Sequence, residues 1–204
     1  MSGPSGDARV PMLPVDEARA IATDGGVPAE MAELSIFRVL LRHPRLARAF
    51  NDLLGMLLFR NTLPHRLREL VIMRIGWVTG SEYEWGQHWR VGHTFFDVPA
   101  ADLAATRDWQ RHDGFDAADR AVLAATDEVL ERGAVSAATW DACIAAIPAA
   151  SPEERDHALL ELFMAIGAWR MVSGVLRSLE VPIEDFTESW PPDGTPPDAS
   201  RVHG

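Results

Sequence analysis

The chain of 204 residues lacks lysine altogether, since all 19 of its basic residues are arginine. Without lysine it cannot form a Schiff base with a carbonyl substrate or pyridoxal phosphate, and it has no P-loop lysine. A single cysteine, Cys143, rules out an intrachain disulfide and a Cys-x-x-Cys redox pair. Aldolase, transaminase, P-loop NTPase and dithiol redox functions are therefore excluded within one chain, and the sparse cysteine favours a reducing compartment.

Positive charge is also scarce, because 30 acidic residues give a formal net charge of −11. That sign repels phosphate backbones and anionic lipid surfaces. No run of about 18 apolar residues is evident, and the N-terminal sequence has no apolar signal-peptide core. We expect a soluble, cytoplasmic protein that binds neither nucleic acid nor a membrane.

Strand-like alternation is rare, whereas apolar residues recur every three or four positions. The pattern predicts an all-α fold with a helical domain at residues 28–180. Residues 1–27 are predicted as an N-terminal arm and residues 181–204 as an acidic, proline-rich tail. The predicted helices span about 28–41, 44–57, 64–78, 81–96, 117–132, 136–147 and 151–179.

The predicted helix at 64–78 has apolar residues on two opposite sides, which indicates burial on both sides. Burial on both sides is consistent with a second chain packing against this helix. Glu69 and Arg74 lie within this apolar pattern. Charged side chains are rarely buried unless they are paired or used. Both are therefore candidate functional residues, with Arg74 either binding a substrate carboxylate or pairing with Glu69.

The next predicted helix carries Ser81, Glu84 and His88 at spacings that place them on one face. A carboxylate beside an imidazole fixes its tautomer and raises its basicity. If Glu69 packs across this face, the site can move protons. The alternative interpretation is that Ser81 and Glu84 form a capping box, with Glu84 and His88 as a surface pair.

Aromatic residues surround this cluster in the sequence. Trp77, Tyr83, Trp85 and Trp89 could line a pocket for a ring-shaped substrate, with a place in the core as the alternative for Trp85 and Trp89. Metal binding by Glu84, His88 and His93 is a weaker alternative because no HExxH-type spacing is present. Ser81 lacks a Gly-x-Ser-x-Gly elbow, and Cys143 lies in an alanine-rich segment that is typical of a buried small hydrophobe.

Two segments, Leu63–Ile72 and Gly80–His88, resemble the signature of the carboxymuconolactone decarboxylase family, which shares its fold with the alkylhydroperoxidase AhpD. The motif covers residues 63–93, and the resemblance extends over about residues 34–185. It implies an AhpD-like bundle of six to eight helices, to which this chain adds an N-terminal helical extension and the proline-rich tail that the shorter decarboxylases lack.

The peroxidase branch of this family has the pattern Glu-x11-Cys-x2-Cys-x3-His. In this chain Glu69 and His88 occupy the glutamate and histidine positions, while Ser81 and Glu84 replace the two cysteines. A serine hydroxyl cannot form a disulfide or a sulfenic acid, so dithiol peroxidase chemistry is not available. The decarboxylase branch has an acid, an aromatic residue and then a histidine, which Glu84, Trp85 and His88 resemble.

The resemblance implies a cofactor-free and metal-free lyase that decarboxylates or isomerises a small cyclic keto acid or lactone. In this role His88 moves the proton, Glu69 and Glu84 orient it, and Ser81 donates a hydrogen bond to the substrate. Family members also assemble as homodimers, trimers or hexamers.

The rival hypothesis is a non-catalytic scaffold or metabolite-binding member of the family. A catalytic His88 should face a cavity, whereas a structural one should be packed with both ring nitrogens hydrogen bonded.

Overall fold

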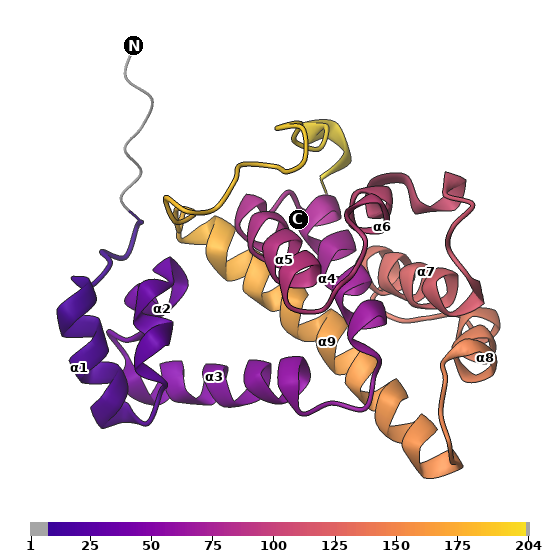
Figure 1. Ribbon diagram of the computed structural model, residues 1–204, viewed down its shortest axis with the longest axis horizontal. Helices are drawn as coiled ribbons and strands as arrows, with labels where there is room; N and C mark the ends of the chain where they lie inside the picture. The colour runs from indigo at the N-terminus through magenta and orange to yellow at the C-terminus, as the bar shows by residue number, and fades with distance from the viewer. Residues whose placement is uncertain (1–7, 203–204) are drawn as a thin grey trace.

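A computed structural model describes residues 8–202, and every regular element in that range is helical (Figure 1). The all-α prediction is therefore confirmed for the described residues. The α-helices are α1 Val15–Gly25, α2 Ser35–Leu40, α3 Pro44–Phe59, α4 His65–Thr79, α5 Glu82–Thr94, α6 Ala100–Ala105, α7 Ala117–Arg132, α8 Ala137–Ala146 and α9 Pro152–Ser178. Short 3-10 turns are η1 Ala29–Glu33, η2 Thr106–Arg111 and η3 Ala199–Arg201.

Most predicted helices coincide with observed ones, and the prediction for 117–132 matches α7 at both ends. The predicted helix at 28–41 is instead divided into η1 and α2, and α1 and α6 were not predicted. The buried face of α1 consists of alanines, with Ala18 and Ala22 fully buried. Because alanine is only weakly hydrophobic, it adds little to the apolar periodicity that indicates a helix, so the sequence pattern did not predict α1.

Helix α4 lies at the centre of the molecule, with α5, α7 and α9 packed around it. Its apolar residues on both sides are buried, including Leu70, Val71, Ile72 and Met73, each with no exposed surface. Double burial is therefore confirmed, but it is achieved within one chain. The expectation that this helix needs a second chain is wrong, because α5 and α9 already cover it.

Helix α9 extends diagonally across the molecule (Figure 1). By length and composition it could span a membrane, and half of the apolar stretch is buried inside the protein. The expectation that no segment meets this test is wrong for α9, because only Glu161 and Arg170 interrupt its apolar run. Partial burial of this kind is typical of the core helix of a globular domain.

The described parts of both terminal segments, residues 8–27 and 181–202, pack onto the helical domain. Residues 1–7 and 203–204 lie outside the described range. From Ala8 onward the N-terminal segment joins a core cluster with α2, α3 and the C-terminal half of α9. Arg38 Nε donates to the carbonyl of Leu13 at 2.7 Å, which holds this segment against α2.

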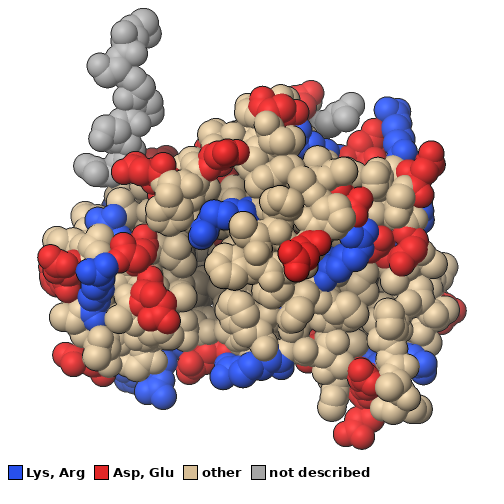
Figure 2. All heavy atoms as spheres, in the orientation of Figure 1, with Lys and Arg blue, Asp and Glu red and all other residues tan. Residues whose placement is uncertain are grey.

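The C-terminal tail lies against α5 and α4. Trp85 Nε1 donates to the carbonyl of Pro191 at 2.7 Å, and Trp190 packs edge-on against Trp77. A Cβ added at Gly86 would lie 2.7 Å from Thr187 Cγ2, so only glycine allows this close approach. On the face of the molecule that is turned toward the viewer, acidic and arginine side chains are interspersed (Figure 2).

Candidate functional site

The candidate site forms where α5 folds back along α4. Gly80 ends α4 in the left-handed conformation, with φ +65°, and Ser81 is the N-cap residue of α5. The turn is tight because Gly76 has no side chain, and a Cβ there would lie 3.1 Å from the backbone nitrogen of Trp85. This antiparallel packing brings His88 of α5 against Glu69 of α4, which meets the condition set above for a site that can move protons.

Glu69 has a complete set of partners. Its Oε2 lies 2.8 Å from His88 Nδ1, and its Oε1 accepts from Arg68 Nε at 3.0 Å and from Arg68 Nη2 at 2.7 Å. Glu69 and Arg68 have no exposed surface. Burial alone would raise the pKa of Glu69, but His88 and Arg68 together lower it below the ordinary value. Glu69 is therefore an ionised anchor for the imidazole.

Arg68 is the cation that sequence reasoning missed. Its Nη1 donates to the carbonyl of Leu58 at 2.7 Å and contacts His65 Nδ1 at 2.6 Å, while its guanidinium lies over the Phe96 ring. Arg68 was detectable in principle, because it is a charged residue directly before Glu69 in an apolar helix. The apolar pattern of this helix indicated Arg74 as the partner of Glu69 instead, because Arg68 and Arg74 both interrupt it.

His88 has hydrogen-bond partners on both sides of its ring. Trp169 Nε1 donates to His88 Nε2 at 3.1 Å, which fixes the neutral imidazole as the Nδ1–H tautomer facing Glu69. Glu84 Oε2 lies 3.6 Å from the same Nε2. Burial lowers the pKa of His88, but the two carboxylates outweigh burial and raise it above the ordinary value.

Glu84 differs from Glu69 in having no arginine partner. Burial raises its pKa to about 7, although His88 and the indole N–H of Trp169 counteract part of the increase. Its carboxyl group is therefore about half protonated near neutral pH, and it lies beside an imidazole whose pKa is raised above the ordinary value. Glu84 and His88 can thus share one proton and pass it on, which is the property required of a general acid or base.

Ser81 does not act as a helix cap. It occupies the N-cap position of α5, but its hydroxyl makes no capping hydrogen bond, and Ser81 Oγ is buried with no partner in the structure. The capping-box interpretation is therefore wrong, because Glu84 turns inward toward His88. A buried hydroxyl without a partner is uncommon in native proteins and calls for a functional explanation.

The four residues predicted to bind substrate do not gather around His88. Arg74 makes a bidentate ion pair with Asp127, at 2.6 and 3.0 Å, so its predicted pairing with Glu69 is wrong. Tyr83 donates its hydroxyl to Glu184 at 2.6 Å. Trp85 is fully buried and packs between aromatic rings, which agrees with the core interpretation.

Two surface grooves are apparent among residues 8–202, and His88 lines neither of them. Arg74 and Trp77 line the larger one, of about 850 Å³, together with Arg107 and Asp127. Only 9% of the His88 side chain is exposed, and both ring nitrogens have partners. These features match the expectation for a structural network.

Metal and thiol chemistry find little support in the described part of the chain. There, no three His, Cys, Asp or Glu side chains are arranged to hold a metal ion. His93 Nδ1 lies 3.3 Å from the carbonyl of Val98 instead of joining Glu84 and His88. Burial raises the pKa of Cys143 to about 11, so its thiol is inert, as expected for a small buried hydrophobe.

Sequence comparison matches residues 44–128 to the carboxymuconolactone decarboxylase family. This segment contains Glu69, Ser81, Glu84 and His88. Over this segment the chain is similar to that family, but it lacks a redox cysteine pair, since Cys143 is its only cysteine. No curated protein sequence matches the chain.

Solved structures extend the family assignment to the fold. A peroxidase-related protein with an AhpD core from Ralstonia eutropha JMP134 has a TM-score of 0.70 at 15% identity, covering 95% of this chain and 100% of that one. A variant of the debrominase Bmp8 in which a cysteine is replaced by alanine, in complex with 2,3,4-tribromopyrrole, has a TM-score of 0.67 at 18% identity. The match covers 91% of this chain and 95% of that one. The AhpD-like fold is therefore confirmed for this chain.

Proposed function

We propose that the protein is a cofactor-independent lyase that decarboxylates or isomerises a small keto acid or lactone. The observation that carries the proposal is the buried chain Glu69–His88–Glu84, in which one carboxylate is held ionised and the other has a pKa of about 7. A network that served only stability would satisfy all its members. Here Ser81 Oγ has no partner, and Glu84 has only the long 3.6 Å approach to the ring and the shared Trp169 N–H.

The two sides of His88 would have different roles. Glu69 holds the Nδ1–H and stabilises the imidazolium when Nε2 takes up a proton. On the other side, Glu84 and His88 Nε2 exchange the mobile proton, and the Trp169 indole N–H can donate to whichever of the two carries the free lone pair. The Ser81 hydroxyl, which has no hydrogen-bond partner, would donate to a substrate oxygen on the Glu84 side of the ring.

Decarboxylation of a β-keto acid breaks the bond between the α-carbon and the carboxylate, and CO2 leaves. The electron pair of that bond forms an enolate, whose oxygen needs a hydrogen-bond donor. The Glu84–His88 pair then supplies a proton to the carbon, and solvent restores the proton to the pair. Isomerisation uses the same pair to remove a proton at one carbon and return it at another.

A small ring-shaped substrate agrees with one structural relative. The debrominase Bmp8 structure holds 2,3,4-tribromopyrrole within the same fold. Because His88 and Glu84 retain only 9% and 6% side-chain exposure, substrate entry would require a local opening at this face.

The test is CO2 release or isomer formation from a panel of lactone and keto acids, with His88 ring signals followed by NMR. Wild-type protein should turn over at least one compound. Glu84→Gln and His88→Ala should lose activity at least a hundredfold, while His157→Ala at an exposed position of α9 should keep it. Turnover that survives both site variants would refute the proposal.

The second candidate is a non-catalytic member of the family, favoured by the packed His88 with both ring nitrogens bonded. In that case no compound in the panel is turned over and none shifts the His88 signals. His88→Ala then lowers only the unfolding temperature.

A further inference from the structure

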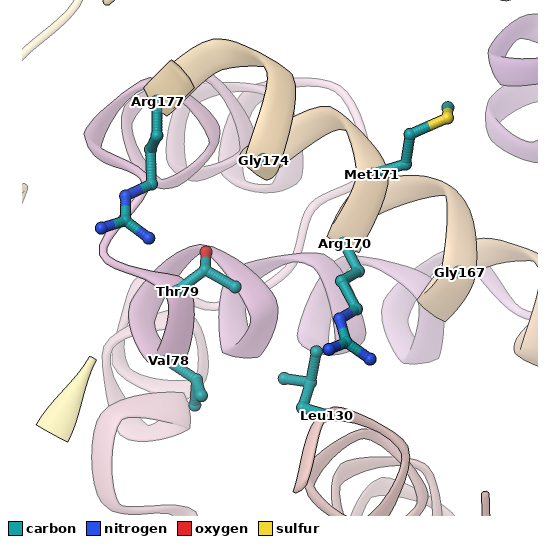
Figure 3. A pocket seen from close by; sticks show the side chains of 8 residues that line it. All are labelled: Val78, Thr79, Leu130, Gly167, Arg170, Met171, Gly174 and Arg177. Carbon is teal, nitrogen blue, oxygen red and sulfur yellow. The ribbon is translucent and has the colours of Figure 1, made fainter. Parts of the chain in front are cut away.

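A groove of about 380 Å³ lies between the C-terminal half of α9 and the ends of α4 and α7 (Figure 3). Its volume is within the range of small-molecule binding sites. Arg170 and Arg177 of α9 line it, whereas no acidic residue does so in the described part of the chain. A depression whose only charged side chains are positive favours an anionic ligand.

These two arginines differ from those of the larger groove beside them. There, Arg74 pairs with Asp127, and the other two arginines also pair with aspartates. The side chains of Arg170 and Arg177 form no ion pair or hydrogen bond with any other described residue. Both guanidinium groups therefore keep their donors available, and each can bind a carboxylate through two parallel hydrogen bonds.

The surface between the two arginines is apolar and open. Gly167 and Gly174 lie on its α9 side, and an added Cβ at either would meet nothing within 4 Å. Val78 and Leu130 line the opposite side. Glycine destabilises the interior of a helix, and no packing contact among the described residues requires it at these two positions. A ligand whose apolar part lies directly on the helix backbone would account for both glycines.

Arg170 and Arg177 stand two helical turns apart on the same side of α9. Their Cα atoms are therefore roughly 10.5 Å apart along the helix axis, at about 1.5 Å per residue. In Figure 3 both side chains extend from α9 toward α4 and α7 at these two levels. Two cations separated by an apolar surface match a ligand that has an acidic group at each end and an apolar centre.

We propose that this groove is a binding site for a small dicarboxylate with an apolar centre. Arg170 and Arg177 each hold one carboxylate, and the chain or ring between the carboxylates lies over the two glycines. The site is distinct from the acid–base cluster, because neither Glu84 nor His88 lines the groove.

The first test titrates azelate, a linear dicarboxylate of comparable length, into the full chain with isotope-labelled methionine methyl groups. The Met171 signal, assigned by leucine substitution, should shift because Met171 lines the groove, whereas that of Met164, elsewhere on α9, should not. The dissociation constant should be on the order of 1 mM or lower at about 50 mM salt. Nonanoate, which has the same chain length and one carboxylate, should bind at least roughly tenfold more weakly.

The second test removes one cation at a time. Arg170→Gln and Arg177→Gln should each weaken azelate binding at least roughly tenfold and abolish the preference for azelate over nonanoate. Arg45→Gln, which removes an exposed arginine of α3 that lines neither groove, should leave both affinities unchanged. Equal weakening in all three variants would show a nonspecific effect of net charge and overturn the proposal.

The third test fills the apolar centre of the groove. Gly174→Leu should block azelate binding and keep or raise the unfolding temperature, because the new side chain meets open space and leucine favours a helix more than glycine does. Gly55→Leu makes the same change at an open position of α3 and should leave azelate binding unchanged. Full azelate binding by a folded Gly174→Leu variant would overturn the proposal.

Absence of a Met171 shift at about 20 mM azelate, or equal affinities for azelate and nonanoate, would also overturn it. These readouts report binding at the groove and do not depend on turnover at His88. Failure of the lyase assay would therefore leave the dicarboxylate site standing, and failure of azelate to bind would leave the proposed lyase function standing.

Discussion

Glu69 and Glu84 face the same imidazole from opposite sides, and both are buried, yet their pKa values move in opposite directions. Glu69 has two close partners, His88 Nδ1 at 2.8 Å and Arg68 Nη2 at 2.7 Å, whereas Glu84 has only the long contact with His88 and the N–H of Trp169. Burial by itself therefore does not decide the charge of a carboxyl group. The close partners decide it, and they divide one polar cluster into a fixed half around Glu69 and a titratable half around Glu84.

Removing the cation from the fixed half should have the largest effect. Arg68→Met leaves Glu69 buried without its guanidinium, and the free energy of unfolding should fall by about 3–5 kcal/mol. Urea denaturation at pH 7 measures this loss. The control is Arg48→Met, which breaks an exposed ion pair with Asp52 and should cost less than about 1 kcal/mol. Equal losses in the two variants would contradict the distinction.

The titratable half predicts a pH dependence of stability. Because the pKa of Glu84 is about 7 in the folded protein, above its unfolded value of roughly 4.3, the folded state holds the extra proton between these values. The free energy of unfolding should therefore decrease as pH rises from about 4.5 to 7, by on the order of 3 kcal/mol. The raised pKa of His88 continues the decrease above pH 6.5.

Glu84→Gln should flatten the profile between pH 4.5 and 7, whereas Glu131→Gln at an exposed site should leave it unchanged. Denaturation curves at several pH values provide the measurement. Glu69 acts in the opposite direction, since its lowered pKa gives stability that is lost as pH falls below about 4.5. A wild-type profile that rises toward pH 7 would count against the assignment.

The indole of Trp169 links the two halves. Trp169→Phe removes the N–H that donates to His88 Nε2, so a donor that favours the neutral ring is lost and the pKa of His88 should rise. The lost hydrogen bond should lower the free energy of unfolding by about 1–2 kcal/mol. An NMR titration of the His88 ring measures the shift. Trp140→Phe, on the half-exposed face of α8, should leave the titration unchanged.

The smallest expected change in stability comes from replacing either of two N-cap serines, Ser81 or Ser151. Ser151 Oγ accepts from the backbone N–H of Glu154 at 3.1 Å, whereas Ser81 Oγ has no partner. Ser151→Ala should cost about 1 kcal/mol, and Ser81→Ala should change stability by less than about 0.5 kcal/mol. If Ser81 binds substrate, Ser81→Ala should still reduce kcat/KM several-fold in the turnover assay. A stability loss equal to that of Ser151→Ala would restore the capping role.

Helix positions and the acid–base cluster were predictable because both depend on local spacing. The i, i+4 relation of Glu84 and His88 and the double apolar pattern of α4 survive in the structure. The prediction of a capping box was wrong because the side chains in a Ser-x-x-Glu sequence can point outward to cap a helix or inward to a site. The prediction that Arg74 pairs with Glu69 was wrong because Arg68 and Arg74 both interrupt the apolar pattern. Sequence spacing does not show which arginine contacts the carboxylate.

The sequence by itself determined the all-α architecture, the exclusion of lysine and dithiol chemistry, and the placement of Glu84 and His88 on one face of a helix. These follow from composition and from periodicity along single helices. The tertiary structure alone decided that Glu69 meets His88, that Trp169 reaches the same ring from 81 residues away, and that residues 8–27 and 181–202 pack onto the domain. Only it decided that Glu84 lacks a cation. Such contacts join segments distant in sequence, and no local pattern encodes the burial and partners that set a pKa.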